Sequence, residues 1–331
     1  MARRDRVRAR LRMGLAVLAV IVLAGLGAPW LAPYDPGEQT DAVAGRHRPP
    51  FTEMAAVELG HGRWRLADRV ERTAEGLRIE RLGKSEIIAA EEVLNLTEAG
   101  VRDRRVFLLG SDGFSRDVFS RLLHGARISL FIGVTSIVLA LTIGVAVGAL
   151  AALSGRFVDS LLMRTVDGLI TFPWLILLIA LAAIFPTGKW VLSLLLGGTA
   201  WMGISRLVRA ELLSLKERDF IVAARGLGAG PLRIFFRHLL PNTLTPILVV
   251  ATLMIGGLIL TEASLSFLGY GIQAPDPSWG NMIAEGRYTM SVAWWVAVFP
   301  GLAIVVTVIA LSLVADGLRD VLDPRTSASE S

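Results

Sequence analysis

Long apolar stretches, separated by shorter polar segments, occupy most of this chain. Six of them are long enough, or nearly so, to cross the roughly 30 Å hydrocarbon core of a bilayer. They cover residues 13–31, 128–153, 161–185, 190–208, 244–268 and 292–314. The first follows a run of arginines, as a signal peptide would, but it is long for one and has only a weak cleavage site. The pattern therefore predicts six transmembrane helices.

The polar segment between the first two stretches has a different periodicity. Residues 62–66 and 77–82 alternate polar and apolar side chains, and Gly76 and Gly83 flank the second run. Alternation with a period of two is typical of a strand that buries one face. We expect a small β-hairpin or mini-sheet here, followed by a short helix near residues 86–96. A mostly irregular surface loop is the alternative.

The positive charges predict which connections are cytoplasmic. Arginines crowd the tail 1–12 and the segment 206–237. Lys and Arg accumulate in short cytoplasmic loops, whereas long loops cross the membrane regardless of their charge. We therefore expect both termini and the basic loop to be cytoplasmic. The long segment between the first two stretches, and the connections 186–189 and 271–291, would then lie outside.

Composition supports a membrane protein, because 53% of the residues are hydrophobic and only 19% are charged. A soluble fold of this size could not cover so much apolar surface. The net charge of +5 could indicate nucleic-acid binding. However, aromatic residues are not interleaved with the arginines, as a base-stacking surface requires. The chain has no cysteine, which excludes disulfides, zinc–thiolate sites and thiol catalysis.

The basic loop 216–242 carries the most specific pattern in the chain. Ala223 and Ala224 are followed by Gly228, and Leu240 and Pro241 come later. We predict two short helices, one ending at the glycine-rich break 228–230 and one with a proline in its first turn. The second helix would expose an apolar stripe that needs a partner protein to cover it. That stripe consists of Ile234, Phe235 and Leu239.

This loop resembles the EAA loop of permeases in ATP-binding cassette (ABC) importers. The pattern there is Glu-Ala-Ala, three residues, Gly, nine residues, Ile-x-Leu-Pro. The matching residues are Ala223, Ala224, Gly228, Leu240 and Pro241. Val222 stands where the family usually has Glu, and His238 stands where it has Ile. An ordinary helix–turn–helix linker is the alternative.

Other stretches are similar to the C-type subunit of the dipeptide/oligopeptide/nickel branch of that family. They cover residues 109–121, 265–271, 275–287 and 316–325. The resemblance implies an all-α transmembrane fold of six helices, that of a type I ABC importer permease, with an extracytoplasmic insertion at about 51–105. The expected segments are a basic tail 1–12, a first transmembrane helix 13–34, an extracytoplasmic segment 35–120, a five-helix permease domain 121–322 and a cytoplasmic tail 323–331.

The resemblance also implies a function. The chain would be an inner-membrane permease subunit that forms half of the translocation path for peptides or related small solutes. Its partners would be a homologous B-type permease, two cytoplasmic ATPase subunits and an extracytoplasmic solute-binding protein. The ATPase contact would involve Val222, Ala223, Ala224, Gly228, Leu240 and Pro241.

The sequence contains no Gly-x-x-x-x-Gly-Lys-[Ser/Thr] motif that could cradle phosphates. The glycine-rich run 226–230 has no Lys-Ser/Thr after it, and we interpret it as a hinge. We therefore expect no catalytic residue, no metal site and no bound cofactor in this chain. ATP would be bound and hydrolysed by the partner subunits.

A few ionisable residues lie within the apolar stretches. A charge at the centre of a transmembrane helix costs on the order of 2.5–3.5 kcal/mol on insertion scales, so it usually faces the bundle interior or a cavity. Arg164 and Asp167 are three residues apart and could pair. Glu262 lies deeper. We assign Glu262 and Ser266 to the translocation path or to packing against a neighbouring helix.

Two other classes of function remain open. A proton-coupled secondary transporter would use Asp167 and Glu262 as a relay, but it would not need the loop 223–241. A membrane-anchored enzyme would place catalysis in residues 36–110. The candidates there, His61, Glu80 and Glu92, show no metal or triad spacing.

Overall fold

The structure is a computed structural model that describes residues 2–59, 63–73, 76–89, 103–186 and 188–322. The expected tail 323–331, His61 and Glu92 lie outside these ranges. The chain divides into two compact units. The first unit comprises residues 1–21, 129–271 and 304–331, and the second comprises residues 22–128 and 272–303.

Among the described residues, five helices are long and apolar enough to cross a membrane, and a bent pair makes up to six. The five lie in α1 (Ala2–Leu26), α3 (Val118–Leu153), α6 (Lys189–Lys216), the continuous segment Pro231–Phe267 and α11 (Trp295–Leu322). The mostly helical, membrane-spanning fold is thus confirmed. α1 begins at Ala2, so the basic tail and the first apolar stretch form one helix.

The third apolar stretch is not one straight helix, contrary to the expected span over 161–185. α4 (Arg156–Thr171) and α5 (Trp174–Ile184) meet at an angle of 82°. Phe172 between them has extended dihedrals, φ −71° and ψ 134°. Pro173 causes this, because the proline ring disfavours helical dihedrals in the residue before it.

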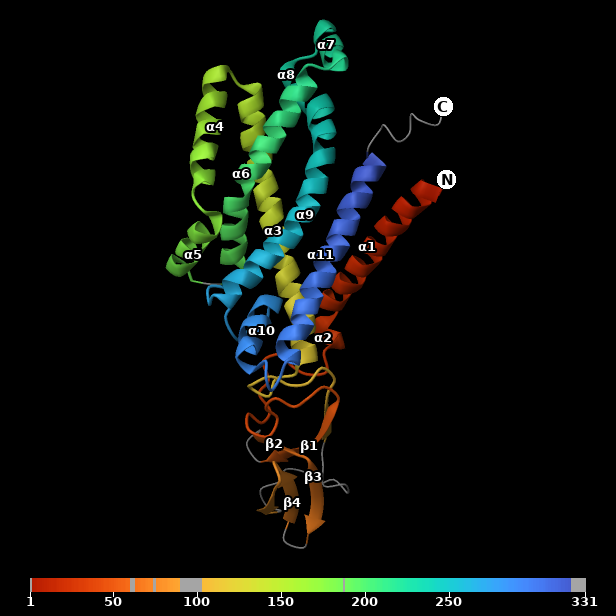
Figure 1. The fold of residues 1–331 in the computed structure, drawn as a ribbon, viewed down its shortest axis with the longest axis vertical. Coiled ribbons are helices and arrows are strands. Elements are labelled where there is room, and N and C mark those ends of the chain that lie inside the picture. The colour runs from red at the N-terminus through yellow and green to blue at the C-terminus, as the bar shows by residue number, and fades with distance from the viewer. Residues whose placement is uncertain (1, 60–62, 74–75, 90–102, 187, 323–331) are drawn as a thin grey trace. The chain divides into compact units, whose positions relative to one another are not determined.

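In the first unit, α6 lies between α4 and α9 (Leu240–Phe267), and α1 runs beside α11 (Figure 1). Lipid provides no hydrophobic drive for helices to associate, so close backbone approach through small residues has to supply the contacts. Gly144 and Gly148 give α3 such a surface against α6. A Cβ at Gly144 would lie 2.7 Å from the Cβ of Ile204, and one at Gly148 would lie 2.5 Å from the carbonyl oxygen of Ser205.

The described residues of the second unit form two three-stranded antiparallel sheets. One has the order β2 (Arg63–Ala67), β1 (Thr52–Leu59), β6 (Asp103–Phe107), and the other has the order β3 (Arg69–Thr73), β4 (Gly76–Arg81), β5 (Lys84–Ala89). The predicted mini-sheet is confirmed, and the irregular-loop alternative is wrong. The alternation in β4 buries Leu77 and Ile79 in a cluster with Val57, Leu59, Ala67 and Ile88.

The expected helix near residues 86–96 is wrong where the structure describes it, because Lys84–Ala89 is strand β5. Arg81 pairs with Lys84, so only Leu82 and Gly83 form the turn. Both have positive φ, 51° and 75°, as two-residue hairpin turns with the twist of the flanking strands require. The glycine is therefore part of a hairpin turn and not the end of the sheet. Residues 90–96 lie outside the described ranges.

The connection 271–291, expected as a plain loop, contains helix α10 (Trp279–Gly286). The hydroxyl of Ser278 accepts a hydrogen bond from the backbone N–H of Asn281, and the side chain of Asn281 accepts one from the backbone N–H of Ser278. This reciprocal pair is a capping box, which satisfies N–H groups that a helix start leaves free.

Replacing Gly148 by alanine should destabilise the first unit by about 1–3 kcal/mol, because the added methyl group would press on the backbone of α6. Gly198→Ala is the matched control, since a Cβ there meets nothing within 4 Å. Thermal unfolding of the detergent-solubilised protein measures both. An unchanged melting temperature for Gly148→Ala would show that α3 and α6 are not closely packed at this point.

Candidate functional site

The loop 216–242 begins with a short helix whose end is fixed by a glycine. α7 (Asp219–Gly226) is followed by Leu227 and by Gly228, which has φ +80°. The N–H of Gly228 donates to the carbonyl of Arg225, and the N–H of Ala229 donates to the carbonyl of Ala224. These two bonds and the left-handed glycine form a Schellman motif. The structure therefore confirms the first of the two predicted helices and the reason for its end.

The second predicted short helix does not exist as a separate element. α8 (Pro231–Ile234) begins at the expected proline but continues through a π-helical turn, η3 (Phe235–Leu239), into α9. The π turn ends at Leu239, two residues before Pro241, which has no N–H to donate and whose ring would crowd the carbonyl four residues earlier. The helix therefore continues past this proline instead of ending at it.

The predicted apolar stripe is not the exposed face. Ile234 and Leu239 are only 4% and 1% exposed, so this chain covers them itself. Other apolar side chains of the loop point outward, and we call them the coupling patch. They are Phe220, Val222, Leu227, Leu232 and Phe236. Of the matched motif residues, Ala223, Gly228 and Pro241 are exposed, and Ala224 and Leu240 are half-buried.

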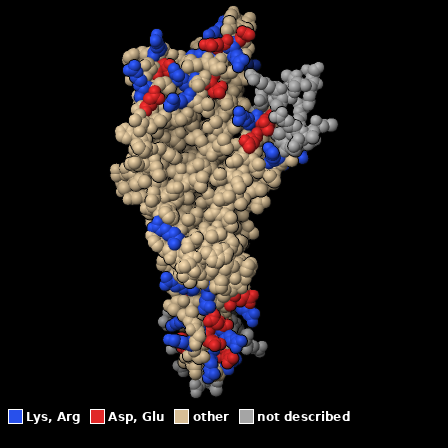
Figure 2. Space-filling model, in the orientation of Figure 1, with Lys and Arg blue, Asp and Glu red and all other residues tan. Residues whose placement is uncertain are grey.

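Charged side chains gather over the end of the first unit that carries α7 and α8 (Figure 2). Two ion pairs join α4 to α6 there. Nε of Arg209 lies 2.5 Å from Oδ1 of Asp159, and its Nη2 lies 2.6 Å from Oδ2, so the contact is bidentate. Asp167 lies 3.7 Å from Arg206. The expected pair between Asp167 and Arg164 is therefore replaced by one between helices.

Glu262 and Ser266 lie one turn apart on α9 and contact each other. Oγ of Ser266 donates to Oε1 of Glu262 over 2.8 Å, and both side chains are buried within the chain. The structure thus brings together the two residues that the sequence singled out in this helix. Their assignment to the translocation path or to packing stays a prediction.

In the second unit, a network of four charged side chains joins the motif 109–121 to α10. Oδ2 of Asp112 accepts from Nε of Arg116 at 2.6 Å and from Nη1 of Arg121 at 2.5 Å. Both arginines also reach Oε2 of Glu285, at 2.7 and 2.6 Å. Asp112, Arg116 and Arg121 are at most 3% exposed. Buried charges of this kind persist only when they are paired and hydrogen-bonded.

Two tryptophans and an acid complete this region. The indole N–H of Trp295 donates to the carbonyl of Ser111, and that of Trp279 donates to the carbonyl of Leu122. Asp117 accepts hydrogen bonds from the backbone and the hydroxyl of Ser120, and burial raises the pKa of its carboxyl group. The sequence marked residues 109–121 and 275–287 only as matching family motifs, and Trp295 only as part of an apolar stretch. The structure shows that the motif encodes an ion network and its supporting contacts.

Two family models match the chain. Residues 144–328 match the model of the binding-protein-dependent transport system inner membrane component, and residues 11–50 match the N-terminal transmembrane domain of oligopeptide transport permease C. The first model covers more than half of the chain. The chain belongs to this family. It is therefore a multi-pass inner-membrane component of an ABC importer.

Relatives and a solved structure agree with this membership. The chain is 37% identical over 326 residues to a Brucella suis protein named as a peptide transport system permease, covering 98% of this chain and 90% of the relative. It is 36% identical to the di/tripeptide transport system permease protein DppC of Pseudomonas aeruginosa, covering 94% and 87%. An inward-facing structure of the MetNI methionine ABC transporter matches with a TM-score of 0.50 at 21% identity, covering 60% of this chain and 96% of that one. This last likeness shows the fold alone, that of an ABC importer permease.

The predicted insertion at about 51–105 falls between the two matched regions of this permease, which end at residue 50 and begin at residue 144. In the structure this segment holds both sheets of the second unit. The boundaries of the insertion, and its place on the extracytoplasmic side, stay predictions.

Asp112→Asn should destabilise the second unit by roughly 3–5 kcal/mol, because it leaves two buried arginines with Glu285 as their shared carboxylate. Arg104→Ala is the control. Its pair with Glu53 spans 3.9 Å and is exposed, so its loss should cost at most about 1 kcal/mol. Denaturant unfolding followed by tryptophan fluorescence compares the two variants. Equal, small effects would show that the network is not a determinant of stability.

Proposed function

We propose that this chain is one of two permease subunits in an ATP-driven importer of peptides or related small solutes. A homologous B-type permease would supply the other half of the path. Two cytoplasmic ATPase subunits would bind and hydrolyse ATP, and an extracytoplasmic binding protein would deliver the solute. The names of the relatives, peptide and di/tripeptide permeases, support the substrate class.

The observation that carries this proposal is the coupling patch. Leu227 is 89% exposed and Leu232 is 73% exposed, on either side of the turn that the Schellman motif sets at Gly228. Large exposed apolar side chains rimmed by polar residues mark surfaces that bind a partner. Exposed arginines occur in the same loop, at Arg218, Arg225, Arg233 and Arg237, in agreement with the expected cytoplasmic side. We therefore assign the patch to an ATPase subunit, together with Val222, Ala223, Ala224 and Gly228.

The structure suggests how movement of that subunit would reach the membrane helices. α8 is continuous with α9, so a displacement of the turn is carried directly into that helix. α6 leads into α7 and is held to α4 by the bidentate pair between Arg209 and Asp159. A push on the loop would therefore move α9 through α8, and α6 with α4 through α7, as alternating access requires.

The secondary-transporter alternative is the weaker one. It would need Asp167 and Glu262 to act as one relay, whereas Asp167 is exposed and pairs with Arg206, and Glu262 is buried and accepts from Ser266. It also leaves the coupling patch without a role. We propose that the energy comes from ATP alone.

Leu227→Asp should abolish ATP-driven uptake, because it places a charge at the most exposed point of the patch without altering the interior. We expect the variant permease to reach the membrane and to lose co-purification with the ATPase subunits. Gly228→Leu should give the same loss of uptake, since a side chain at φ +80° strains the turn. The control is Leu82→Asp, an exposed leucine beside a glycine in the second unit. Wild-type uptake by Leu227→Asp would refute the assignment of the patch.

Glu262→Gln distinguishes transport driven by ATP from transport driven by a proton gradient. Glutamine keeps the acceptor for the hydroxyl of Ser266 but cannot titrate, so a hydrogen-bonding role survives and a proton relay does not. We expect vesicles with ATP, and with the proton gradient collapsed, to take up peptide with wild-type or Glu262→Gln permease. Glu262→Ala should be impaired because it leaves a buried hydroxyl without its acceptor. Uptake that disappears with the gradient and in Glu262→Gln alike would establish the secondary transporter instead.

A further inference from the structure

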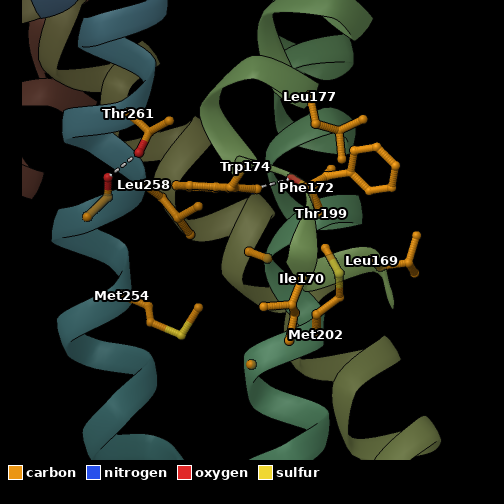
Figure 3. Close-up of a pocket in the computed structure, with 13 residues that line it drawn as sticks. Leu169, Ile170, Phe172, Trp174, Leu177, Thr199, Met202, Met254, Leu258 and Thr261 are labelled. Atoms are coloured by element: carbon orange, nitrogen blue, oxygen red, sulfur yellow. Dashed lines mark hydrogen bonds between the residues drawn. The ribbon is translucent and has the colours of Figure 1, made fainter. Parts of the chain in front are cut away.

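The first unit contains a cavity of about 480 Å³. None of the residues that were given a role above lines it. The break between α4 and α5 forms one wall, α6 a second and α9 a third (Figure 3). None of its lining residues is charged. Its volume is in the range of roughly 300–1,000 Å³ that is typical of small-molecule sites. The side chains that define its interior are Phe172, Trp174, Met202, Met254, Leu258 and Thr261.

The broken span is the first reason to assign a function to this cavity. Non-helical backbone within a transmembrane segment is tolerated only where protein covers it or where it lines a cavity. The extended residue Phe172 and the following Pro173 are such a point. Transporters use discontinuous helices of this kind to build their solute sites. Pro173 causes the bend locally, and the bend places the extended residue Phe172 in the wall of the cavity.

The polar groups of the wall are already engaged with each other or with backbone. The indole N–H of Trp174 donates to Oγ1 of Thr199 over 2.8 Å, and Thr199 donates to the carbonyl of Leu195 over 2.8 Å. The hydroxyl of Thr261 donates to the carbonyl of Gly257 over 2.8 Å. A charged ligand group would lose its hydration here and find no counter-charge. The wall therefore suits an uncharged, apolar group.

Glycines keep the space open without serving the packing of this unit. Gly203 of α6 and Gly257 of α9 line the cavity, and a Cβ at either position would meet nothing within 4 Å. This differs from Gly144 and Gly148, where a Cβ would press on α6. Two methionines from facing helices, Met202 and Met254, add side chains that adapt to different shapes. Such a wall tolerates apolar groups of varied size.

We propose that this cavity receives an apolar side chain of the solute in transit, while the charged ends of the solute remain outside it. The inference rests on the proposed function and narrows it, because it makes side-chain hydrophobicity a determinant of transport through this subunit. The occupant is the transported peptide. A lipid chain or a side chain of the other permease is an outcome that the experiment must distinguish.

The first test fills the cavity without disturbing the helices. Gly257→Leu and Gly203→Leu place a leucine side chain in the open space, and Gly198→Leu is the control. A Cβ at Gly198, which is also on α6, would meet nothing within 4 Å, but this glycine does not line the cavity. The complete importer in proteoliposomes, supplied with ATP, is given trileucine or trialanine. Uptake of trileucine should fall at least about tenfold in the two cavity variants, as steric discrimination in an apolar pocket predicts, with trialanine changing less than about twofold.

The second test uses the absence of cysteine from this chain. Thr261→Cys lies in the cavity and Ser264→Cys lies three residues away on the exposed side of α9. The two parent hydroxyls are matched, since each donates to the carbonyl four residues earlier over 2.8 Å. In the assembled importer, trileucine should slow modification of Thr261→Cys by a methanethiosulfonate reagent and leave Ser264→Cys unaffected.

Four results would overturn the inference. Equal loss of both peptides in the cavity variants, or loss of the other permease from the purified complex, would make the cavity a packing surface between subunits. Protection of Thr261→Cys that varies with lipid and not with peptide would make it a lipid site. Unchanged uptake of trileucine would leave the cavity without a role in transport. A wild-type importer that takes up no peptide with ATP would instead refute the proposed function itself, so the two failures are distinguishable.

Discussion

Lipid offers no hydrogen bonds, so each segment that crosses the bilayer must satisfy its own backbone polar groups. In this chain the requirement produces long, uninterrupted helices such as α3, which runs from Val118 to Leu153. In lipid the hydrophobic effect does not drive helices together, so close packing through glycine has to stabilise their association. Helical continuity and close glycine packing are two consequences of the one constraint.

Departures from helical continuity are therefore informative. Pro173 breaks a span completely, and the break opens onto a cavity. Pro241 sits where a π turn accommodates it, so that the helix runs unbroken from the exposed turn at Pro231 into α9. The first proline yields a bend and an open space, and the second yields a rigid connection. Proline is thus found both where a helix breaks and where it continues, and the backbone conformation around each proline determines the outcome.

Sequence reasoning succeeded where the signal is local. Hydropathy located the helices, alternation located β4, and Gly228 marked the end of α7, because each depends on neighbours within one or two turns.

Sequence reasoning failed where the structure depends on residues that are distant in the sequence. The periodicity of residues 234–239 defined an apolar face, but only the fold shows that this face is covered by the chain itself. Likewise the charges of Asp112, Arg116 and Arg121 were visible, but Glu285 lies 164 residues beyond Arg121. The break at Pro173 was within reach of local reasoning, since a proline inside an apolar stretch is a warning of this kind.

The functional residues of the first unit share a few helices, and this has a mechanical consequence. α9 continues from α8 and η3, which follow the exposed turn. It lines the cavity through Met254, Leu258 and Thr261 and carries Glu262 at the next position. α6 lines the same cavity through Met202 and leads into α7. A helix transmits displacement along its axis because its backbone hydrogen bonds resist stretching. The cavity and the coupling patch are therefore connected by two helices and not by a chain of side-chain contacts.

Under the proposed function, a movement that an ATPase imposes on the patch changes the distance between two walls of the cavity. The third wall, at the break after α4, follows α6 through the Arg209–Asp159 pair. The cavity would therefore change its shape in each cycle. Its polar groups bond within α5 and α6 or within α9, so a shift of α9 against α6 leaves none of these hydrogen bonds unmade, and the methionines adapt to the new shape.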